Sequence, residues 1–377
     1  MIYLDNNATT KPTARVVTAM LHYLTDCYYN ASALTSAFTD ADKPRREAAA
    51  EMSKLLNAEE PDCFTFTSGA TESNNWVLSS IAKGHRDGCI LISAIEHPSV
   101  SVPAAELASV GAKAREVPVD ARGLIRMDAL RDALKSGTSL VSIMAANNET
   151  GVVEPIPEIG RLVHELCPSA IFHTDATQAI GRIPIDLQGA WQDVDLLSFS
   201  AHKFHGPKGI GGLYIRPAID LSAMIRGGGQ EQGRRSGTSN TPALAGLASA
   251  AADARPFENE VIRSLRDGFE AKLQDARPNV MIHSRDVPRL PNTSCFSLPD
   301  VNGEQLAERL AASGIIVGTG AACSSGAIDG SKTLRAMGLP HGIVMSCLRV
   351  SLSRSSTAAE LDALLSAITH GCVNQPV

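Results

Sequence analysis

The feature that most restricts the fold of this chain is an alternation of short apolar runs with helix-like segments between most of them. Runs rich in β-branched and aromatic residues stand at 63–67, 90–93, 140–145, 170–174, 196–199 and 212–215. This alternation predicts an α/β fold, with a mainly parallel sheet covered by helices on both faces. In such a sheet, binding sites form at the carboxyl ends of the strands.

The composition changes after about residue 250, which indicates a second, smaller unit. The pattern there predicts a helical stretch at 243–276, strands at 280–283 and 293–298, a helix near 303–313, a strand at 348–353 and a closing helix from Thr357. A chain of 377 residues commonly divides into two domains. We therefore expect a large domain at 13–255 and a smaller α+β domain made of 1–12 and 256–377.

The overall composition excludes some classes of function. Hydrophobic residues make up 44% and charged residues 20%, which is typical of a soluble globular protein. A net charge of -6 and a pI near 5.9 leave no basic stripe for phosphates, so we expect no direct nucleic-acid binding. We found no basic leader before an apolar core and no apolar run of membrane-spanning length, so we expect a cytoplasmic protein.

Polar side chains follow the predicted strands at the points where a site is expected. Thr71 lies in a turn after the first strand, His97 follows the second, and Asn148 follows the third. Asp175 and Lys203 follow later strands. We therefore expect these residues to meet at one edge of the sheet, in a cleft between the two domains.

Lys203 and Asp175 together indicate one particular cofactor chemistry. Lys203 comes just after the apolar run 194–199 and beside a glycine-rich turn, and Asp175 ends the run before it. Enzymes that use pyridoxal 5'-phosphate (PLP) hold its aldehyde as an imine on a lysine and keep its pyridine nitrogen protonated with a carboxylate. Either stretch alone is more often an ordinary strand-to-turn junction. Their order and spacing together favour a PLP site.

Cys323 differs from the other cysteines in its surroundings. The eight cysteines contain no C-x-x-C pair and no metal-ligand spacing, so we expect no metal site. Most lie in apolar runs, where a reduced thiol acts as a small hydrophobic side chain. Cys323 lies instead in the small-residue run 317–330, which predicts an exposed loop. An incidental loop cysteine is the alternative interpretation.

The motifs, taken in order, resemble those of cysteine desulfurases of the NifS/IscS type. They are Tyr3-Leu-Asp5-Asn-Asn-Ala-Thr9-Thr, Ser68-Gly-Ala-Thr71-Glu-Ser-Asn-Asn75, Glu96-His97, Asn147-Asn148-Glu-Thr-Gly151, Asp175-Ala-Thr-Gln178, Ser200-Ala-His202-Lys203, Arg235-Ser-Gly-Thr238 and Gly320-Ala-Ala-Cys323-Ser-Ser. The resemblance covers nearly the whole chain, and the small residues around Cys323 resemble group I of the family. It implies PLP-dependent fold type I and conversion of L-cysteine to L-alanine.

The resemblance also implies the residues that hold the cofactor. Lys203 would carry PLP as an imine and then act as the base at the substrate Cα, Asp175 would pair with the pyridine nitrogen, and Gln178 would donate to the ring oxygen. A helix N-terminus favours a dianion, so the phosphate would sit there. Its ligands would be Ala70, Thr71, Ser200 and His202.

Further implied roles concern the substrate and the sulfur. His97 would stack on the pyridine ring and relay protons, although a hydrogen-bonded core histidine is the alternative. Arg349 would grip the substrate carboxylate through a bidentate pair, with Asn148 beside it and Asn30 as a weaker candidate. Cys323 would take the sulfur as a persulfide and pass it to an acceptor protein.

The resemblance implies a homodimer, because Thr238 matches a position that reaches the phosphate of the neighbouring subunit. The chain departs from the family pattern at 31–46, where a usual histidine is missing. This departure puts the role of Asn30 in doubt. A selenocysteine lyase or another class V PLP enzyme remains an alternative function, and a non-catalytic sulfur-transfer scaffold remains a second.

Overall fold

The large unit of the fold is built on a seven-stranded mixed sheet. The computed structural model describes residues 1–84, 88–135, 137–254, 259–299, 301–319 and 330–371. The strand order is β2 (Phe64–Thr67), β8 (Gly211–Ile215), β7 (Leu196–Ser200), β6 (Ile171–Asp175), β5 (Thr138–Ser142), β3 (Cys89–Ser93) and β4 (Lys113–Val117). Only β8 runs against the other six strands of this sheet. The prediction of a mainly parallel α/β sheet is confirmed.

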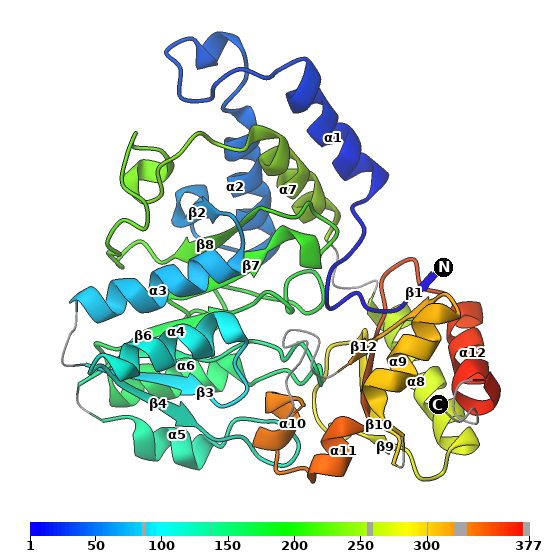
Figure 1. The fold of residues 1–377 in the computed structure, drawn as a ribbon. Coiled ribbons are helices and arrows are strands. Elements are labelled where there is room, and N and C mark those ends of the chain that lie inside the picture. Colours follow the sequence, from blue (N-terminus) through cyan, green and yellow to red (C-terminus); the bar gives the residue numbers. More distant parts are fainter. Residues whose placement is uncertain (85–87, 136, 255–258, 300, 320–329, 372–377) are drawn as a thin grey trace.

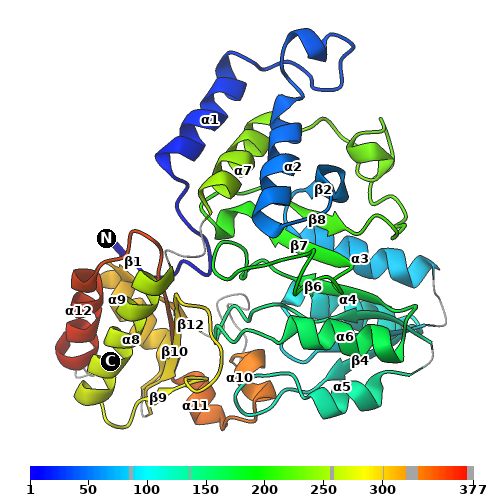
Figure 2. The ribbon, with the colours of Figure 1, turned by 180° about the vertical axis from the view of Figure 1, so that it is seen from behind.

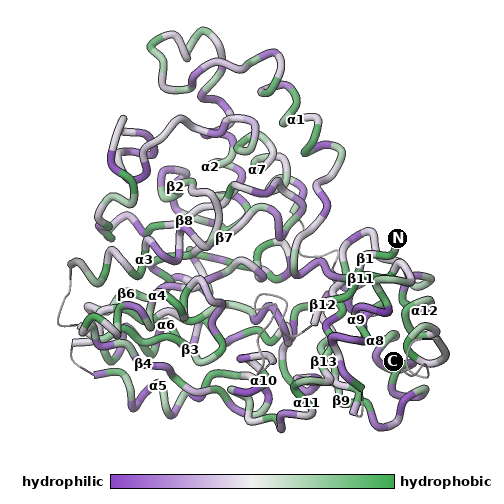
Figure 3. Tube along the Cα trace, in the orientation of Figure 1, coloured by the Kyte–Doolittle hydropathy of each residue, from purple (hydrophilic) through white to green (hydrophobic). Residues whose placement is uncertain are grey.

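Side chains that alternate along the strands enter two hydrophobic cores, one on each face of this sheet. Leu197 and Phe172 point into one core, whereas their neighbours Leu196 and Ile171 contact the other. Strands that are buried on both faces read as continuous apolar runs, which explains why they could be recognised in the sequence. Hydrophobic residues concentrate along these strands in Figure 3.

Helices cover both faces of the large sheet (Figures 1 and 2). Residues of α2 (Lys43–Leu56), α6 (Ile156–Leu166) and α7 (Thr241–Asp253) belong to the first core. Residues of α3 (Ala70–Gly84) and α4 (Pro98–Ser109) belong to the second core. The remaining helices of this unit are α1 (Ala14–Thr25), which packs against α7, and α5 (Met127–Ala133).

The smaller unit has its own antiparallel sheet and its own core. The sheet order is β12 (Gly318–Thr319), β13 (Cys347–Ser351), β10 (Thr293–Ser297) and β9 (Met281–Ile282). The other elements are α8 (Asn259–Ala276), α9 (Gly303–Ala312), α10 (Lys332–Ala336), α11 (His341–Met345), α12 (Ala358–Ser366) and the π-helical turn Ala367–Gly371. Strand β1 (Ile2–Tyr3) pairs in parallel with β11 (Ile315–Ile316).

The N-terminal residues link the two units. Leu4 is fully buried in the core of the smaller unit, next to the β1–β11 pair. From there the chain runs to α1, which lies at the far end of the large unit in Figure 1. The boundaries 1–12, 13–255 and 256–377 stay a prediction, and the separate cores support it.

Two predictions about the elements were wrong. The helix expected at 243–276 is not continuous, because α7 ends at Asp253, Ala254 is extended, and α8 begins at Asn259. Helix α7 is apolar on nearly all sides and packs in the core of the large unit, whereas α8 is amphipathic and packs against the core of the smaller unit. The sequence analysis also missed β4, an edge strand whose exposed Lys113 and Glu116 hide its strand character.

No helix among the described residues is both long enough and apolar enough to cross a membrane.

Candidate functional site

A cavity of about 280 Å³ lies where the carboxyl ends of β6 and β7 face the smaller unit. This volume is close to the lower end of the roughly 300–1,000 Å³ found for small-molecule sites. The cavity brings together ten of the residues predicted from the sequence. They are Ala70, Thr71, His97, Asn148, Asp175, Gln178, Ser200, His202, Lys203 and Arg349.

Asp175 is held as a fixed hydrogen-bond acceptor at the end of β6. Its Oδ2 accepts from Asn74 Nδ2 at 2.7 Å, and its Oδ1 accepts from the backbone N–H of Thr177 at 2.9 Å. The side chain is buried and lines the cavity. These two donors fix the orientation of the carboxyl group, and a carboxylate is the partner that a protonated pyridine nitrogen requires.

Lys203 lies at the end of a 3₁₀ turn that follows β7 (Ala201–Lys203). Its Nζ donates to the carbonyl oxygens of Asn7 at 2.6 Å and Ala8 at 2.9 Å. These carbonyls belong to the N-terminal strap, which we define as residues 5–8. The strap therefore keeps the amine at the wall of the cavity, in the turn after β7, and β7 is the strand next to the one that carries Asp175.

His97 has a defined tautomer. The backbone N–H of Ser99 donates to His97 Nδ1 at 3.1 Å, so this nitrogen carries no proton in the neutral ring. Burial lowers the pKa of His97, and the positive charge of Lys203 lowers it further, although the Asp175 carboxylate acts in the opposite direction. The ring is therefore neutral near pH 7 with its proton on Nε2. That arrangement leaves an N–H hydrogen-bond donor on a side chain that lines the cavity.

The N-terminus of α3 forms another wall of the cavity. Ala70 and Thr71 begin this 15-residue helix, and the Oγ of Ser200 accepts from the backbone N–H of Ala70 at 2.8 Å. His202 lies nearby, with Nδ1 3.1 Å from Thr9 Oγ1. Burial and nearby cations, first Lys203, lower the pKa of His202 to about 4, so its ring is neutral at pH 7. Helix dipole, backbone N–H groups and hydroxyls at one place suit a phosphate dianion.

Arg349 lies in β13 on the side of the cavity that the smaller unit forms. Its Nη2 donates to Asp5 Oδ1 at 2.6 Å and its Nη1 to the carbonyl oxygen of Asn148 at 2.8 Å. The guanidinium lies over Gly318, where a Cβ atom would come within 2.7 Å of Nη2 and 2.8 Å of Asp5 Oδ1. A Cβ atom at 318 would therefore displace the guanidinium or the Asp5 carboxylate, so the glycine leaves room for Arg349 in its observed direction.

Three predicted site residues are not among the cavity residues. Asn30 is exposed, and its Oδ1 accepts from the backbone N–H of Ser32 at 2.9 Å. Thr238 is also exposed. Its segment is held at the start of α3 by an ion pair between Arg235 Nε and Glu72 Oε1, at 2.8 Å. Cys323 lies outside the described residues.

The residues of the cavity fit PLP. A lysine amine, a carboxylate on the adjacent strand and a helix N-terminus face the same space, which matches the aldehyde, pyridine nitrogen and phosphate of the cofactor. In addition, Thr177 Oγ1 lines this space and is buried without a hydrogen-bond partner among the described residues. Such a group is expected where a polar ligand belongs.

Sequence analysis missed several residues that position this site. Asn74 holds Asp175, Asp5 holds Arg349, and the strap carbonyls hold Lys203. Asn74 and Asp5 both fall inside motifs that the sequence analysis singled out. Asn74 lies four residues after Ala70, on the same side of α3, and this spacing was the available signal. No local pattern connects Asp5 with Arg349, because 344 positions separate them.

The comparisons with known proteins agree with this geometry. The family model for class V aminotransferases matches residues 2–364. A cysteine desulfurase of Sinorhizobium fredii is 42% identical over 372 residues, which is 97% of this chain and 95% of that protein. A solved NifS-like protein is 36% identical with a TM-score of 0.90, and the match covers 98% of both chains. The structure of SspA in complex with cysteine is 30% identical with a TM-score of 0.83, over 95% of this chain and all of that one (100%). The chain therefore belongs to the class V aminotransferase family, and within it to the PLP-dependent cysteine desulfurases of the NifS/IscS type.

Proposed function

We propose that this enzyme converts L-cysteine to L-alanine, keeps the sulfur as a persulfide on Cys323 and passes it to an acceptor protein. The observation that carries the proposal is the single cavity that holds Lys203, Asp175 and Arg349. Lys203 and Asp175, which would hold PLP, thus share a cavity with the guanidinium of Arg349. A guanidinium is the side-chain group best suited to bind the carboxylate of an amino-acid substrate. SspA, a similar protein, has been solved with cysteine bound.

Lys203, Asp175, Gln178 and the start of α3 would hold PLP. When bound, PLP supplies an electron sink that stabilises negative charge on the substrate Cα. Each oxygen of the Asp175 side chain accepts a hydrogen bond from a fixed donor, which holds the group in place. From this position Asp175 would stabilise a positive charge at the pyridine nitrogen. Lys203 would remove the Cα proton, because its Nζ lies at the cavity wall near the strap.

Arg349 and His97 would position the substrate through hydrogen bonds. Arg349 donates from separate nitrogens to Asp5 and to the Asn148 carbonyl, so its plane is fixed before the substrate arrives. His97 is neutral with its proton on Nε2, so that N–H group would donate a hydrogen bond to a polar or negatively charged group in the cavity.

The sulfur step would use Cys323 as the nucleophile. Its thiolate attacks the substrate sulfur, so an S–S bond forms while the substrate Cβ–S bond breaks. The electron pair of the broken bond stays on the substrate carbon, and protonation of that carbon gives alanine. A thiol of the acceptor protein then takes the outer sulfur from the persulfide. Gly318 pairs directly with Arg349 and lies five positions before Cys323 in the sequence.

A homodimer forms part of this proposal. Helix α1 exposes Val17, Leu21 and Leu24 at helical spacing, with exposed fractions of 45%, 51% and 59%. Tyr28 and Phe38, which follow α1 in the sequence, are also exposed, at 71% and 90%. Such a surface is usually covered by a partner, and a second copy of this chain would also bring a Thr238 that one chain leaves outside its own cavity.

The dimer is tested by the change Leu21→Asp on the exposed face of α1. Sedimentation velocity should show a dimer for the unaltered protein and a shift toward monomer for the variant, because the charge opposes burial of this face. Glu106→Asp, in the last turn of α4, is a control that changes no exposed apolar residue. A monomeric unaltered protein would contradict this part of the proposal.

A cytoplasmic location is also part of the proposal. The six cysteines among the described residues are free thiols, which agrees with a reducing compartment.

The decisive experiment for the function is Cys323→Ser, with Cys89→Ser as a matched control on strand β3. We expect Cys323→Ser to bind PLP and L-cysteine but to release almost no alanine, because a serine hydroxyl is not ionised at pH 7. The control should keep its activity. After one turnover without reductant, mass spectrometry of the unaltered protein should place one additional sulfur on the peptide with Cys323. Near-normal alanine release by Cys323→Ser would instead favour a lyase.

A further inference from the structure

Arg182 is a buried cation that neither the sequence motifs nor the proposed mechanism uses. It follows β6 and lies at the inner end of the turn that also carries Gln178. Its side chain is 8% exposed. Burial lowers the pKa of Arg182 to about 9, and the charge of Arg349 contributes, so the guanidinium is still charged at pH 7. A charge in such a place requires an explanation, because burial of an ion is costly.

The hydrogen bonds of Arg182 all go to uncharged oxygen atoms within the described chain. Nη1 donates to the carbonyl oxygen of Gln178 at 3.0 Å and, through a short contact, to Gln178 Oε1. Nη2 donates to the carbonyl oxygen of Asn6 at 3.3 Å and to that of Lys203 at 3.2 Å. The guanidinium fork thus joins the strap, the Gln178 turn and the backbone of the proposed PLP lysine.

These contacts fix which way the amide of Gln178 points. A guanidinium only donates hydrogen bonds, so the amide atom that faces Arg182 has to be the acceptor Oε1. The donor Nε2 must then turn the other way, where it lies 3.0 Å from the carbonyl oxygen of Asn7 and on the cavity wall. A flipped amide would place the NH₂ group against the guanidinium, and both groups would be donors.

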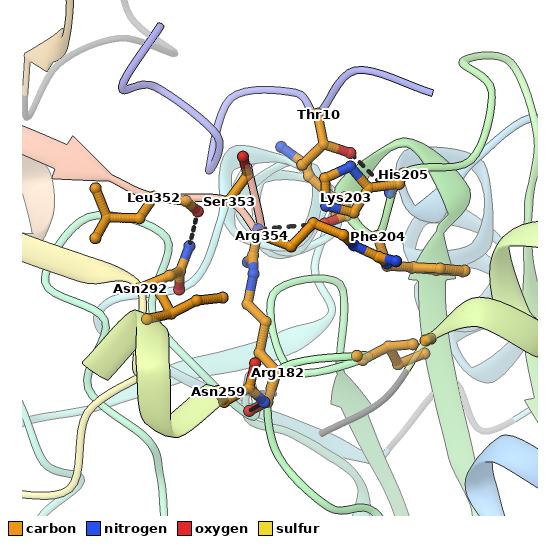
Figure 4. A pocket seen from close by; sticks show the side chains of 14 residues that line it. Thr10, Arg182, Lys203, Phe204, His205, Asn259, Asn292, Leu352, Ser353 and Arg354 are labelled. Atoms are coloured by element: carbon orange, nitrogen blue, oxygen red, sulfur yellow. Dashed lines mark hydrogen bonds between the residues drawn. The ribbon is translucent and has the colours of Figure 1, made fainter. Parts of the chain in front are cut away.

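A small cavity of about 40 Å³ lies behind Lys203, and Arg182 forms part of its wall. Figure 4 shows Arg182 there with Lys203, Asn259 and Arg354, which come from separate segments of the chain. Asn259, the first residue of α8, donates from Nδ2 to the carbonyl oxygen of Arg182. The space suffices for little more than water, so Arg182 is not part of a second ligand site here.

We propose that Arg182 is a positioning residue that makes Gln178 an obligate hydrogen-bond donor toward the cofactor ring oxygen and holds the backbone of Lys203. The inference rests on the proposed function, because it requires that Gln178 faces PLP. Arg182 itself touches neither substrate nor cofactor and acts through these two residues. In the same way, a residue that hydrogen-bonds to a metal-binding histidine fixes the tautomer of that histidine without contacting the metal.

The test follows the visible absorption of the bound cofactor as a function of pH. A donor on the ring oxygen reduces its negative charge and weakens its hold on the proton shared with the Lys203 nitrogen, so it lowers the titration midpoint. Gln178→Ala should raise the midpoint by about 0.5–1 pH unit, the size expected for one hydrogen bond. Arg182→Lys should raise it in the same direction, because one ammonium cannot hold all three segments.

A double-mutant cycle separates positioning from a general structural effect. If Arg182 acts through Gln178, Arg182→Lys should shift the midpoint by less than about 0.2 pH unit in a Gln178→Ala background, because interacting sites are not additive. Arg266→Lys is the matched control, since Arg266 is a buried arginine that donates to a backbone carbonyl, Leu290, at 2.7 Å. This control should lower stability without moving the midpoint.

A second variant tests the amide orientation without altering Arg182. In Gln178→Glu one carboxylate oxygen would stay on Arg182 and the other would replace the donor, so the midpoint should rise at least as far as in Gln178→Ala. An unchanged midpoint in Gln178→Glu would show that an acceptor already faces the ring and would overturn the inference. A full shift from Arg182→Lys in the Gln178→Ala background would overturn it as well. Absence of any PLP absorption or alanine release in the unaltered protein would instead refute the proposed function.

Discussion

The proposed grip on the substrate carboxylate can be tested by removing Arg349. The Arg349 side chain is 3% exposed and already holds Asp5 Oδ1 at 2.6 Å, so Arg349→Ala removes a fixed cation and also leaves a nearly buried carboxylate behind. Breaking a buried ion pair costs about 3–5 kcal/mol of stability. We expect a value near 3 kcal/mol, because the Asp5 side chain retains 13% exposure.

The effect on catalysis has to be measured where this loss of stability does not intervene. Asp5→Asn removes the unpaired charge, so kinetics should be compared between Asp5→Asn and Asp5→Asn/Arg349→Ala. Loss of a buried, hydrogen-bonded charge partner should cost about 2–4 kcal/mol of transition-state binding. This cost equals roughly a 30- to 1,000-fold fall in kcat/KM for L-cysteine.

L-Cysteine methyl ester separates a carboxylate contact from a general defect, because it lacks the negative charge that Arg349 would bind. The fall in kcat/KM on removing Arg349 should therefore be under about threefold for the ester. Urea unfolding of the same proteins would measure the accompanying change in stability. Equal losses for L-cysteine and its ester would refute the reasoning and assign Arg349 a purely structural role beside Asp5.

The remaining predictions concern three other positions. Lys203→Ala should fold yet lose the visible absorption of the bound cofactor and all turnover, and a cofactor link still reducible by borohydride would contradict this. Gly318→Ala should lower kcat/KM for L-cysteine about as much as Arg349→Ala, since its Cβ would come within 2.7 Å of Arg349 Nη2; an unchanged value would contradict the geometry. Burial raises the pKa of Glu96 from 4.5 to about 8, so the native state binds its proton more tightly than the unfolded state. Its contribution to stability is therefore complete below about pH 4.5 and is lost as pH rises to about 8; Glu96→Gln should flatten this decline in urea titrations, and an unchanged slope would refute it.

Most of the large sheet could be predicted because burial on both faces makes its strands rich in apolar and β-branched residues. The run that became β7 includes Leu196 and Phe199, which enter cores on opposite faces, and the one polar residue between them, Ser198, is fully buried. The rule that sites form at carboxyl ends then placed Asp175 and Lys203 together before any contact was known. Edge strand β4 had no such signal, because its outer side chains meet solvent.

The positioning contacts of the site could not be predicted in the same way. Asp5 and Arg349, Asn74 and Asp175, and Arg182 and Asn6 are separated by 344, 101 and 176 positions. Pairs of this kind arise only when the sheet and the smaller unit pack together, so they follow no local period. The motifs identified some of these residues as unusual without indicating what they contact.

The N-terminal strap explains why these distant contacts serve one site. Asn7 receives a hydrogen bond from Lys203 on its carbonyl oxygen and donates from Nδ2 to Thr293 Oγ1 in the smaller unit. Its backbone N–H donates to Ser351 Oγ, two residues after Arg349. The strap therefore fixes the distance between the lysine on the large sheet and the arginine on the small one. That distance determines where a substrate Cα lies relative to Nζ, so packing between the two units and alignment for proton transfer depend on the same few hydrogen bonds.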